Sequence, residues 1–315
     1  MTSSSTPPVG PRPTFLVAGA ARCGTTALVE GLRNHPQVFV TMPKEPHYFA
    51  LHGQVVDFRG PGDDATVNRV SVTDHDAYMK LYPPGTDHVA FGDGSVSTLY
   101  YAENAVPEIL RVNPQMRLAV MLRDPVDRAF SSFQYLRARG FEPHEDFMAA
   151  LDDEPDRIRD NWHHLWHYTA MSLYADGLQT LREGLGAERV GVWFYDDLDR
   201  DADATISRVL RFFQVPEHPA ESAGISRVNV SGTPRLAPVT RAIQWATTIE
   251  PLRKLVKKTT SFGLREFVRR HSLRPTTVSA AARARLEPLF ADDLRRVADM
   301  VGDVEAPAWL RPQQS

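Results

Sequence analysis

The residues with the clearest chemical pattern form a short loop between the apolar run Phe15 to Ala18 and a helical pattern that begins at Thr25. Gly19 and Gly24 allow the backbone to approach a ligand where a Cβ atom would hinder it. Backbone N–H groups at the start of a helix bind anions with the help of the helix dipole. Thr25 and Thr26 can add hydroxyl donors. The stretch therefore predicts a strand, a phosphate-binding loop and a helix.

This loop differs from the nucleotide P-loop at one position that matters for chemistry. The P-loop pattern is Gly-x4-Gly-Lys-Ser/Thr, whereas Thr25 stands here in place of the lysine. A P-loop NTPase uses that lysine on the β- and γ-phosphates, so its loss argues against hydrolysis of ATP or GTP. The cation inside the loop is Arg22, directly before Cys23. These features suit a nucleotide that carries a single 5′ phospho-anhydride.

Three stretches together resemble sulfotransferases that use 3′-phosphoadenosine-5′-phosphosulfate (PAPS). GAARCGTTAL resembles their 5′-phosphosulfate loop, and RDPVDRAFSSF resembles their 3′-phosphate motif, an arginine followed by a serine eight residues later. RVNVSGTPR is similar to the late basic segment that closes over the nucleotide in bacterial and carbohydrate-type members. The stretches follow the family order and span most of the chain. The resemblance implies that PAPS and its product PAP are held by Ala21, Arg22, Cys23, Gly24, Thr25, Thr26, Arg123, Ser131, Arg227, Ser231, Gly232 and Arg235.

Sulfuryl transfer to a hydroxyl group depends on positioning, on neutralisation of charge and on a base that removes the hydroxyl proton. Carbohydrate-type sulfotransferases use a glutamate in a Glu-x-His-Phe-Phe stretch, and the resemblance gives Glu45 this role. His47 is the rival base or orients Glu45, because alternate residues of an extended segment share a face. Arg22 replaces the lysine usual in the family's loop, and as the third catalytic candidate it would grip the leaving group bidentately.

Four further residues are candidates for the acceptor side of the site. Lys44 would face away from Glu45 in an extended segment and still reach the leaving sulfate. Asp93 follows a predicted strand, where contact with the acceptor and a strand-end turn are equally favoured. Trp162 and His167 belong to the cluster WHHLWH, which suits the wall of an acceptor pocket or core packing. This cluster lacks the pattern of a metalloprotease, and we expect no metal.

Two alternatives to a sulfotransferase remain open. A P-loop nucleotide kinase would explain the loop but not the second phosphate motif. A non-catalytic homologue that binds PAP or PAPS would explain why Arg22 replaces the lysine. For an active enzyme, the resemblance to carbohydrate-type members favours a hydroxyl of a carbohydrate, glycolipid or secondary-metabolite acceptor.

Composition excludes several other classes of function. The chain has 315 residues, 42% of them hydrophobic, and a net charge of −3, so it has no global basic field for nucleic acid. Cys23 is the single cysteine, which fits a reducing compartment. The N-terminus lacks a signal-peptide pattern and no window predicts a transmembrane helix, so we expect a cytoplasmic enzyme. Segment 241–272 is basic and could touch an anionic or lipid-linked acceptor, although a solvated covering helix is favoured.

The elements that must position these residues alternate between strand and helix. Strands are expected at 14–18, 38–40, 88–92, 117–122 and 189–195, and helices at 25–34, 76–82, 104–112, 127–139, 171–185 and 202–213. This order predicts an α/β fold with a P-loop-like parallel sheet and helices on both faces, as in sulfotransferases. We expect a disordered tail at 1–13 and one domain at 14–315, with a basic, lid-like helical segment at 236–275 and a C-terminal helix at 276–303.

Overall fold

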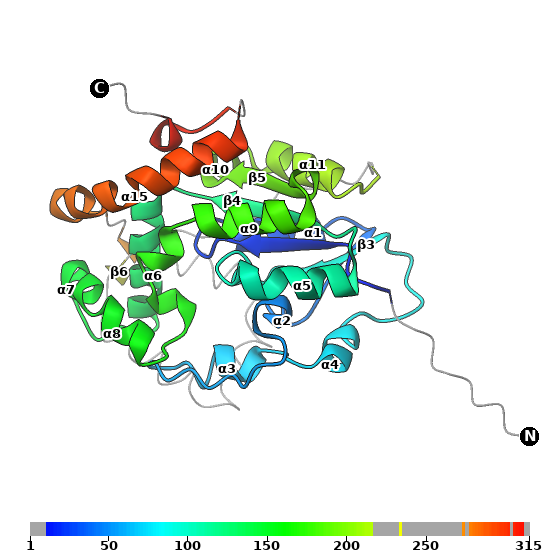
Figure 1. Cartoon of the computed structure of the whole chain (residues 1–315), viewed down its shortest axis with the longest axis horizontal. Helices are drawn as coiled ribbons and strands as arrows, with labels where there is room; N and C mark the ends of the chain where they lie inside the picture. Colours follow the sequence, from blue (N-terminus) through cyan, green and yellow to red (C-terminus); the bar gives the residue numbers. More distant parts are fainter. Residues whose placement is uncertain (1–10, 217–232, 235–272, 275–276, 303–304, 312–315) are drawn as a thin grey trace, which may run out of the picture.

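Five parallel strands form the central sheet of the protein. The computed structural model describes residues 11–216, 233–234, 273–274, 277–302 and 305–311 (Figure 1). In the order β2-β3-β1-β4-β5, the strands are β2 (Val38–Val40), β3 (Ala90–Asp93), β1 (Phe15–Gly19), β4 (Arg117–Leu122) and β5 (Val190–Phe194). The central strand β1 is buried along its whole length, as its apolar sequence requires of a parallel strand covered on both faces.

The connecting helices cover both faces of this sheet. They are α1 (Thr25–Arg33), α5 (Ala102–Val112), α9 (Ala175–Leu185) and α11 (Ala202–Phe212). The chain crosses from β1 to β2 in one direction and from β3 to β4 and β5 in the other. Right-handed connections therefore place α1 on one face and α5 and α9 on the opposite face. In agreement, α1 packs against α11, whereas α5 packs against α9 in front of the sheet in Figure 1. The predicted fold class is confirmed.

The remaining elements surround this core. The helices are α2 (Tyr48–Leu51), α3 (Val67–Val70), α4 (His75–Met79), α6 (Pro125–Ala138), α7 (Phe147–Asp152), α8 (Glu154–Arg159), α10 (Tyr195–Arg200) and α15 (Ala280–Val301). Short 3-10 helices are η1 (His164–Trp166), η2 (Ala170–Ser172), η3 (Ala187–Arg189) and η5 (Ala308–Leu310). A separate antiparallel pair is formed by β6 (Thr233–Pro234) and β7 (Leu273–Arg274). None of the helices in the described ranges is long and apolar enough to cross a membrane.

Several expected boundaries were wrong in detail; for example, α9 begins at Ala175, four residues later than predicted. Helix α6 begins at Pro125, two residues earlier than predicted, because the side chain of Asp124 accepts a hydrogen bond from the backbone N–H of Asp127 and caps the helix. Leu273 and Arg274 belong to the segment predicted as a helical lid, yet they form strand β7 opposite β6. The rest of that segment lies outside the described residues.

The carboxyl ends of the five strands lie along one edge of the sheet, because all strands are parallel. The phosphate loop follows β1, the Glu45 segment follows β2, and Arg123 follows β4 directly. Open α/β sheets bind ligands at this edge. The topology alone therefore places the phosphate loop, the Glu45 segment and Arg123 at the same edge of the sheet.

Candidate active site

The loop after β1 has the geometry of an anion cradle. Its first residue is fixed to the sheet, because the backbone N–H of Ala20 donates to the carbonyl of Met121 at 2.8 Å. Gly24 precedes α1 with a φ of 85°, and a Cβ atom there would lie 2.8 Å from the side chain of Leu198. None of the side chains that the structure describes caps α1, so its first N–H groups can bind an anion.

The loop cation contacts the second phosphate motif. Nε of Arg22 donates to the hydroxyl of Ser131 at 3.4 Å, although 109 positions separate them in the sequence. The guanidinium carbon of Arg22 lies 4.4 Å from the centre of the Tyr135 ring. Ser131 and Tyr135 are neighbours on one face of α6. The side chains predicted for the 5′ and 3′ phosphate groups are therefore brought together.

Arg123 lies on the other side of the same loop. Its Nη1 donates to the carbonyl of Arg22 at 3.4 Å, and its guanidinium carbon lies 4.5 Å from the centre of the Tyr195 ring. Two carboxylates close to Arg123 in the sequence, Asp124 and Asp127, could form an ion pair with it. These carboxylates instead pair with Arg283 of α15, at 3.1 Å and 2.5 Å. The guanidinium of Arg123 thus faces an aromatic ring and the loop.

Cys23 contributes packing rather than chemistry to the loop. Its side chain is fully buried, and Sγ lies 4.0 Å from the hydroxyl of Tyr174. Burial raises the pKa of the Cys23 thiol to about 11, against the opposing charges of Arg128, Arg123 and Arg22. The thiol is therefore neutral at physiological pH. Only the backbone of Cys23, and not its side chain, is available to contact a ligand in the loop.

The segment after β2 is tied to the end of β3. The N–H of Thr41 donates to the carbonyl of Gly92 at 3.1 Å, and the N–H of Gly94 donates to the carbonyl of Lys44 at 2.9 Å. The N–H of His47 donates to the hydroxyl of Ser95 at 2.9 Å. These bonds hold Glu45 at the same edge of the sheet as the phosphate loop.

Glu45 is a charged, partly buried carboxylate. Burial acts to raise its pKa, but Lys44, His47 and Arg22 lower it, and the net result lies below the ordinary value of a glutamate. Lys44 forms an ion pair with Glu45, so the prediction that Lys44 faces away was wrong. Because the charge of the loop residue Arg22 lowers the pKa of Glu45, the carboxylate lies close enough to the loop to interact with it electrostatically. At neutral pH this carboxylate is ready to accept a proton.

His47 lies beside Glu45, but not for the predicted reason. The residue has a φ of 56°, so the segment is not extended there. Its Nε2 lies 4.0 Å from Oε2 of Glu45, and its Nδ1 lies 2.8 Å from the hydroxyl of Ser97. Burial lowers the pKa of His47 to about 4 despite the nearby carboxylate. A neutral imidazole fixed by Ser97 suits orientation of Glu45 better than proton abstraction.

Two acceptor-side candidates are held by contacts inside the protein. Asp93 is fully buried, and its two oxygens accept hydrogen bonds from the hydroxyl of Tyr78 at 2.7 Å and the N–H of Ser95 at 2.9 Å. Burial raises the pKa of Asp93 above its ordinary value. These contacts favour the strand-end turn over contact with an acceptor.

His167 is also fixed within the fold. Its Nδ1 lies 2.9 Å from the hydroxyl of Tyr100, and its Nε2 lies 2.9 Å from the carbonyl of Trp162. The ring of Trp162 stands edge-on to Trp166, with centroids 4.8 Å apart. These contacts favour core packing over a pocket wall. Within the ranges that the structure describes, no three His, Cys, Asp or Glu side chains converge as metal ligands would.

Four residues near the candidate site were not predicted from the sequence: Tyr135, Tyr195, Ser95 and Ser97. Tyr195 ends a predicted strand at the ligand-binding edge, so its position was a usable signal. Tyr135 follows Ser131 by one helical turn, which is also visible in the sequence. The two serines lie in a loop whose contacts with His47 bridge 48 and 50 positions, and no local pattern indicates such contacts.

The third resembling stretch is described only at Thr233 and Pro234, which form β6. Arg227, Ser231, Gly232 and Arg235 lie outside the described residues, so their predicted roles stay predictions. Strand β6 contacts α6, the helix that carries Ser131, and Figure 1 shows the two side by side. This part of the stretch therefore lies next to the second phosphate motif.

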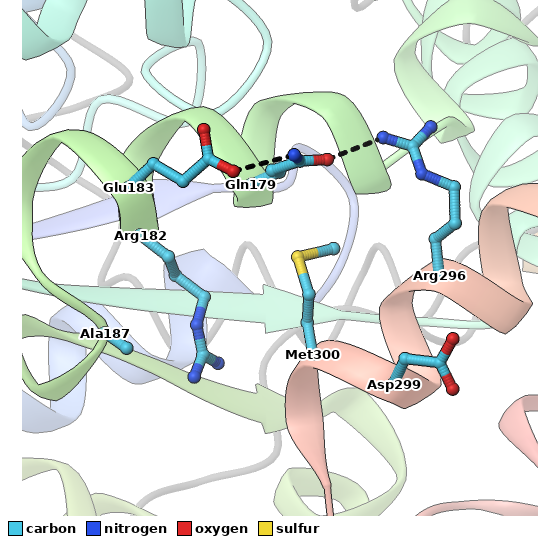
Figure 2. Close-up of a pocket in the computed structure, with 7 residues that line it drawn as sticks. All are labelled: Gln179, Arg182, Glu183, Ala187, Arg296, Asp299 and Met300. Atoms are coloured by element: carbon cyan, nitrogen blue, oxygen red, sulfur yellow. Dashed lines mark hydrogen bonds between the residues drawn. The ribbon is translucent and has the colours of Figure 1, made fainter.

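A surface groove lies away from these residues, between α9 and α15 (Figure 2). Its volume is about 430 Å³, and hydrogen bonds join Gln179 to Glu183 at 2.7 Å and Arg296 to Gln179 at 2.9 Å. The other lining residues are Arg182, Ala187, Asp299 and Met300. The groove contains none of the predicted site residues, so the loop edge of the sheet is the better candidate site.

Comparison with known proteins agrees with this assignment. Residues 13–219 match the Sulfotransferase family. Carbohydrate sulfotransferase 15 from Mus musculus is 29% identical over 153 residues, which cover 39% of this chain and 27% of the relative. Bifunctional heparan sulfate N-deacetylase/N-sulfotransferase 2 from Bos taurus is 29% identical over 129 residues, which cover 41% of this chain and 13% of the relative. The matched region thus spans about a quarter or less of these relatives.

Solved structures extend the similarity to nearly the whole chain. A sulfotransferase from Alicyclobacillus acidocaldarius has a TM-score of 0.72 and 26% identity, with coverage of 96% of this chain and 100% of that structure. Mouse sulfotransferase SULT7A1, solved in complex with PAP, has a TM-score of 0.52 and 16% identity, with coverage of 92% and 86%. The second likeness concerns the fold alone.

Proposed function

The chain belongs to the sulfotransferase family, and we propose that it transfers the sulfuryl group of PAPS to a hydroxyl group of an acceptor, giving a sulfate ester and PAP. The contact between Arg22 and Ser131 carries this proposal, because it joins the loop of the 5′-phosphosulfate to the motif of the 3′-phosphate. Arg123, stacked on Tyr195 at the other side of the loop, would hold the 3′-phosphate together with Ser131.

The arrangement supports in-line transfer with Glu45 as general base. Glu45 would take the proton of the acceptor hydroxyl as the new oxygen–sulfur bond forms and the bond from sulfur to the phosphate oxygen breaks. Arg22 and the N–H groups at the start of α1 would stabilise the charge that develops on the leaving phosphate. His47, neutral and hydrogen-bonded to Ser97, would orient the carboxylate. No metal ion is required for these steps.

The acceptor is proposed as a hydroxyl of a carbohydrate, a glycolipid or a secondary metabolite. Its support is the similarity to a carbohydrate sulfotransferase, over the part of that relative that this chain covers. A fold neighbour was solved with PAP, so the fold can hold this nucleotide. A second candidate is a homologue that binds PAP without turnover. It is favoured by Arg22, whose contacts with Ser131 and Tyr135 hold the loop cation against α6.

Thermal unfolding with PAP, with PAPS, with ATP and Mg²⁺, and in buffer alone tests the proposal. A ligand at one hundred times its Kd stabilises the folded state by about 2.7 kcal/mol. For a chain of 315 residues that corresponds to a rise in Tm of roughly 4 °C. We expect this rise with PAP, its loss in Arg123→Ala, and its retention in Arg59→Ala, a control whose side chain is 71% exposed.

The outcomes separate the candidates. A shift with PAP together with sulfate-ester formation from PAPS supports the enzyme. A shift with PAP but no turnover with any acceptor tested supports the binding homologue. A shift with ATP and Mg²⁺ in the absence of one with PAP would refute the proposed nucleotide.

A further inference from the structure

Arg128 is a buried cation that the proposed mechanism does not use. Its side chain on α6 is fully buried. Nε donates to the hydroxyl of Ser172 at 2.6 Å, and Nη2 donates to the carbonyl of Tyr168 at 2.7 Å. The third nitrogen, Nη1, is buried without a hydrogen-bond partner in the part of the chain that the structure describes.

No carboxylate among the described residues lies within ion-pair distance of Arg128. Glu154 acts on it electrostatically from farther away, and both oxygens of Glu154 accept hydrogen bonds from the N–H of Thr169. Another buried arginine, Arg157, does have a counter-charge: it forms an ion pair with the buried carboxylate of Glu142 at 2.7 Å. A buried charge without a counter-charge costs free energy, so its retention calls for a reason.

The position of Arg128 supplies that reason. It lies three residues before Ser131 on α6, so both buried side chains are on the same face of the helix. Ser131 contacts the loop residue Arg22. Tyr174, between these parts, donates to the carbonyl of Arg123 at 3.0 Å and contacts Cys23. Arg128 therefore lies behind the phosphate loop.

The electrostatics of the loop agree with this position. Among the charges that lower the pKa of Cys23 against burial, Arg128 has a larger effect than Arg123 or Arg22. Its charge is thus felt within the loop although the side chain is covered by protein. Both Cys23 and Tyr174 are neutral at physiological pH, because burial raises their pKa. In the described part of the chain, the charge of Arg128 is therefore offset by Glu154 from a distance and by no carboxylate in contact with it.

We propose that Arg128 is the buried counter-charge of the nucleotide, neutralised when the phosphate groups of PAPS or PAP occupy the loop in front of it. The identity of the anion rests on the proposed function. Arg128 is a positioning residue, because it acts through the loop and not by contact with the nucleotide. One unit charge acting over roughly 8 Å at an effective dielectric constant of about 20 changes affinity about thirtyfold.

The test compares Arg128→Met with Arg128→Lys, using the PAP dissociation constant from calorimetry and the Tm of the unliganded protein. We expect Arg128→Met to weaken PAP binding at least about tenfold while the unliganded Tm holds or rises, because an uncompensated buried charge is removed. Arg128→Lys should keep most of the affinity. A purely structural residue would give the reverse, a lower unliganded Tm and an unchanged PAP dissociation constant, and that result would overturn the proposal.

A second pair of variants leaves Arg128 in place, in case Arg128→Met does not fold. Ser172→Asp puts a carboxyl group beside Nε of Arg128, to which Ser172 is now hydrogen-bonded, and Ser172→Asn is its uncharged control. Neutralising Arg128 in advance should weaken PAP binding at least about tenfold in Ser172→Asp relative to Ser172→Asn. Equal PAP affinities in the two variants would refute the counter-charge.

Pyrophosphate, measured in the same series, separates this proposal from the proposed function. If the wild-type protein binds pyrophosphate but not PAP, the assigned nucleotide is wrong, and the pyrophosphate affinities of the variants still decide the role of Arg128. If the wild-type protein binds neither, both proposals fall.

Discussion

The buried histidines near the site predict a loss of stability in mild acid. Burial lowers the pKa of His47 and of His167 to about 4, and holds that of His164 well below its ordinary value. In the unfolded chain a histidine titrates near 6.5. Between these values the unfolded state binds more protons than the folded state, so stability falls as the pH is lowered through this window.

The size of the effect follows from the lowered pKa values of His47 and His167. A difference of about 2.5 pH units is worth about 3 kcal/mol for each residue, so His47 and His167 together remove about 6 kcal/mol between pH 6.5 and pH 4. Domains are stable by only about 5–15 kcal/mol in total. Glu45 does not contribute to the pH dependence of stability in the upper part of this window, because its pKa is lowered and its titration affects stability only at more acidic pH. The two histidines should therefore remove a large part of the stability before pH 4, partly opposed by Asp93, Asp127 and Asp293, whose raised pKa values favour the folded state in acid.

Urea unfolding at 25 °C between pH 7 and pH 5 measures this dependence. In the neutral form, Nε2–H of His167 donates to the carbonyl of Trp162 while Nδ1 accepts from Tyr100. His167→Gln should reduce the slope of unfolding free energy against pH by about 1.4 kcal/mol per unit near pH 5, the value for one proton. His75→Asn, at a side chain that is 38% exposed, is the matched control. An unchanged slope in His167→Gln would refute the reasoning.

Two further predictions concern Glu45 and Cys23. Glu45→Gln should lower kcat about 10²- to 10⁴-fold, the usual contribution of a general base, and retain PAP binding, whereas the exposed control Glu103→Gln should keep full activity; full turnover in Glu45→Gln would exclude it as the base. The Cys23 thiol, with a pKa raised to about 11 by burial, should react with a thiol reagent at pH 8 at least about a hundredfold more slowly in the native protein than in urea, and rapid labelling of the native protein would contradict its burial.

Features of the fold that depend on a local sequence pattern could be predicted from the sequence. The apolar run that forms β4 ends at Arg123, and a parallel strand with both faces covered must have such a run. Gly24 marks the point where the chain needs a left-handed residue before α1. The topology that follows from alternating strands and helices then places the loop and Arg123 at one edge of the sheet.

Contacts between distant residues could not be predicted in this way. His47 reaches Glu45 through a left-handed backbone conformation that no propensity indicates for histidine in an apparently extended segment. Asp124 and Asp127 pair with Arg283, 159 and 156 positions away, which removes the ion pair that their closeness to Arg123 suggested. Asp93 is held by Tyr78 of α4, and only the packing of α4 against the sheet decides this.

The contacts of Arg22 explain why an arginine, and not the usual lysine, suits this loop. A lysine is a mobile point charge, whereas a guanidinium is planar and stacks on aromatic rings. Arg22 uses both properties of the guanidinium, because it stacks on Tyr135 and donates to Ser131 of the same helix. The loop cation is thereby coupled to Ser131, the serine proposed to hold the 3′-phosphate, and Arg128 precedes that serine by three residues on α6. The charges that would meet the two ends of the nucleotide are thus fixed relative to one helix, so α6 is the element that would set the spacing between the two proposed phosphate sites.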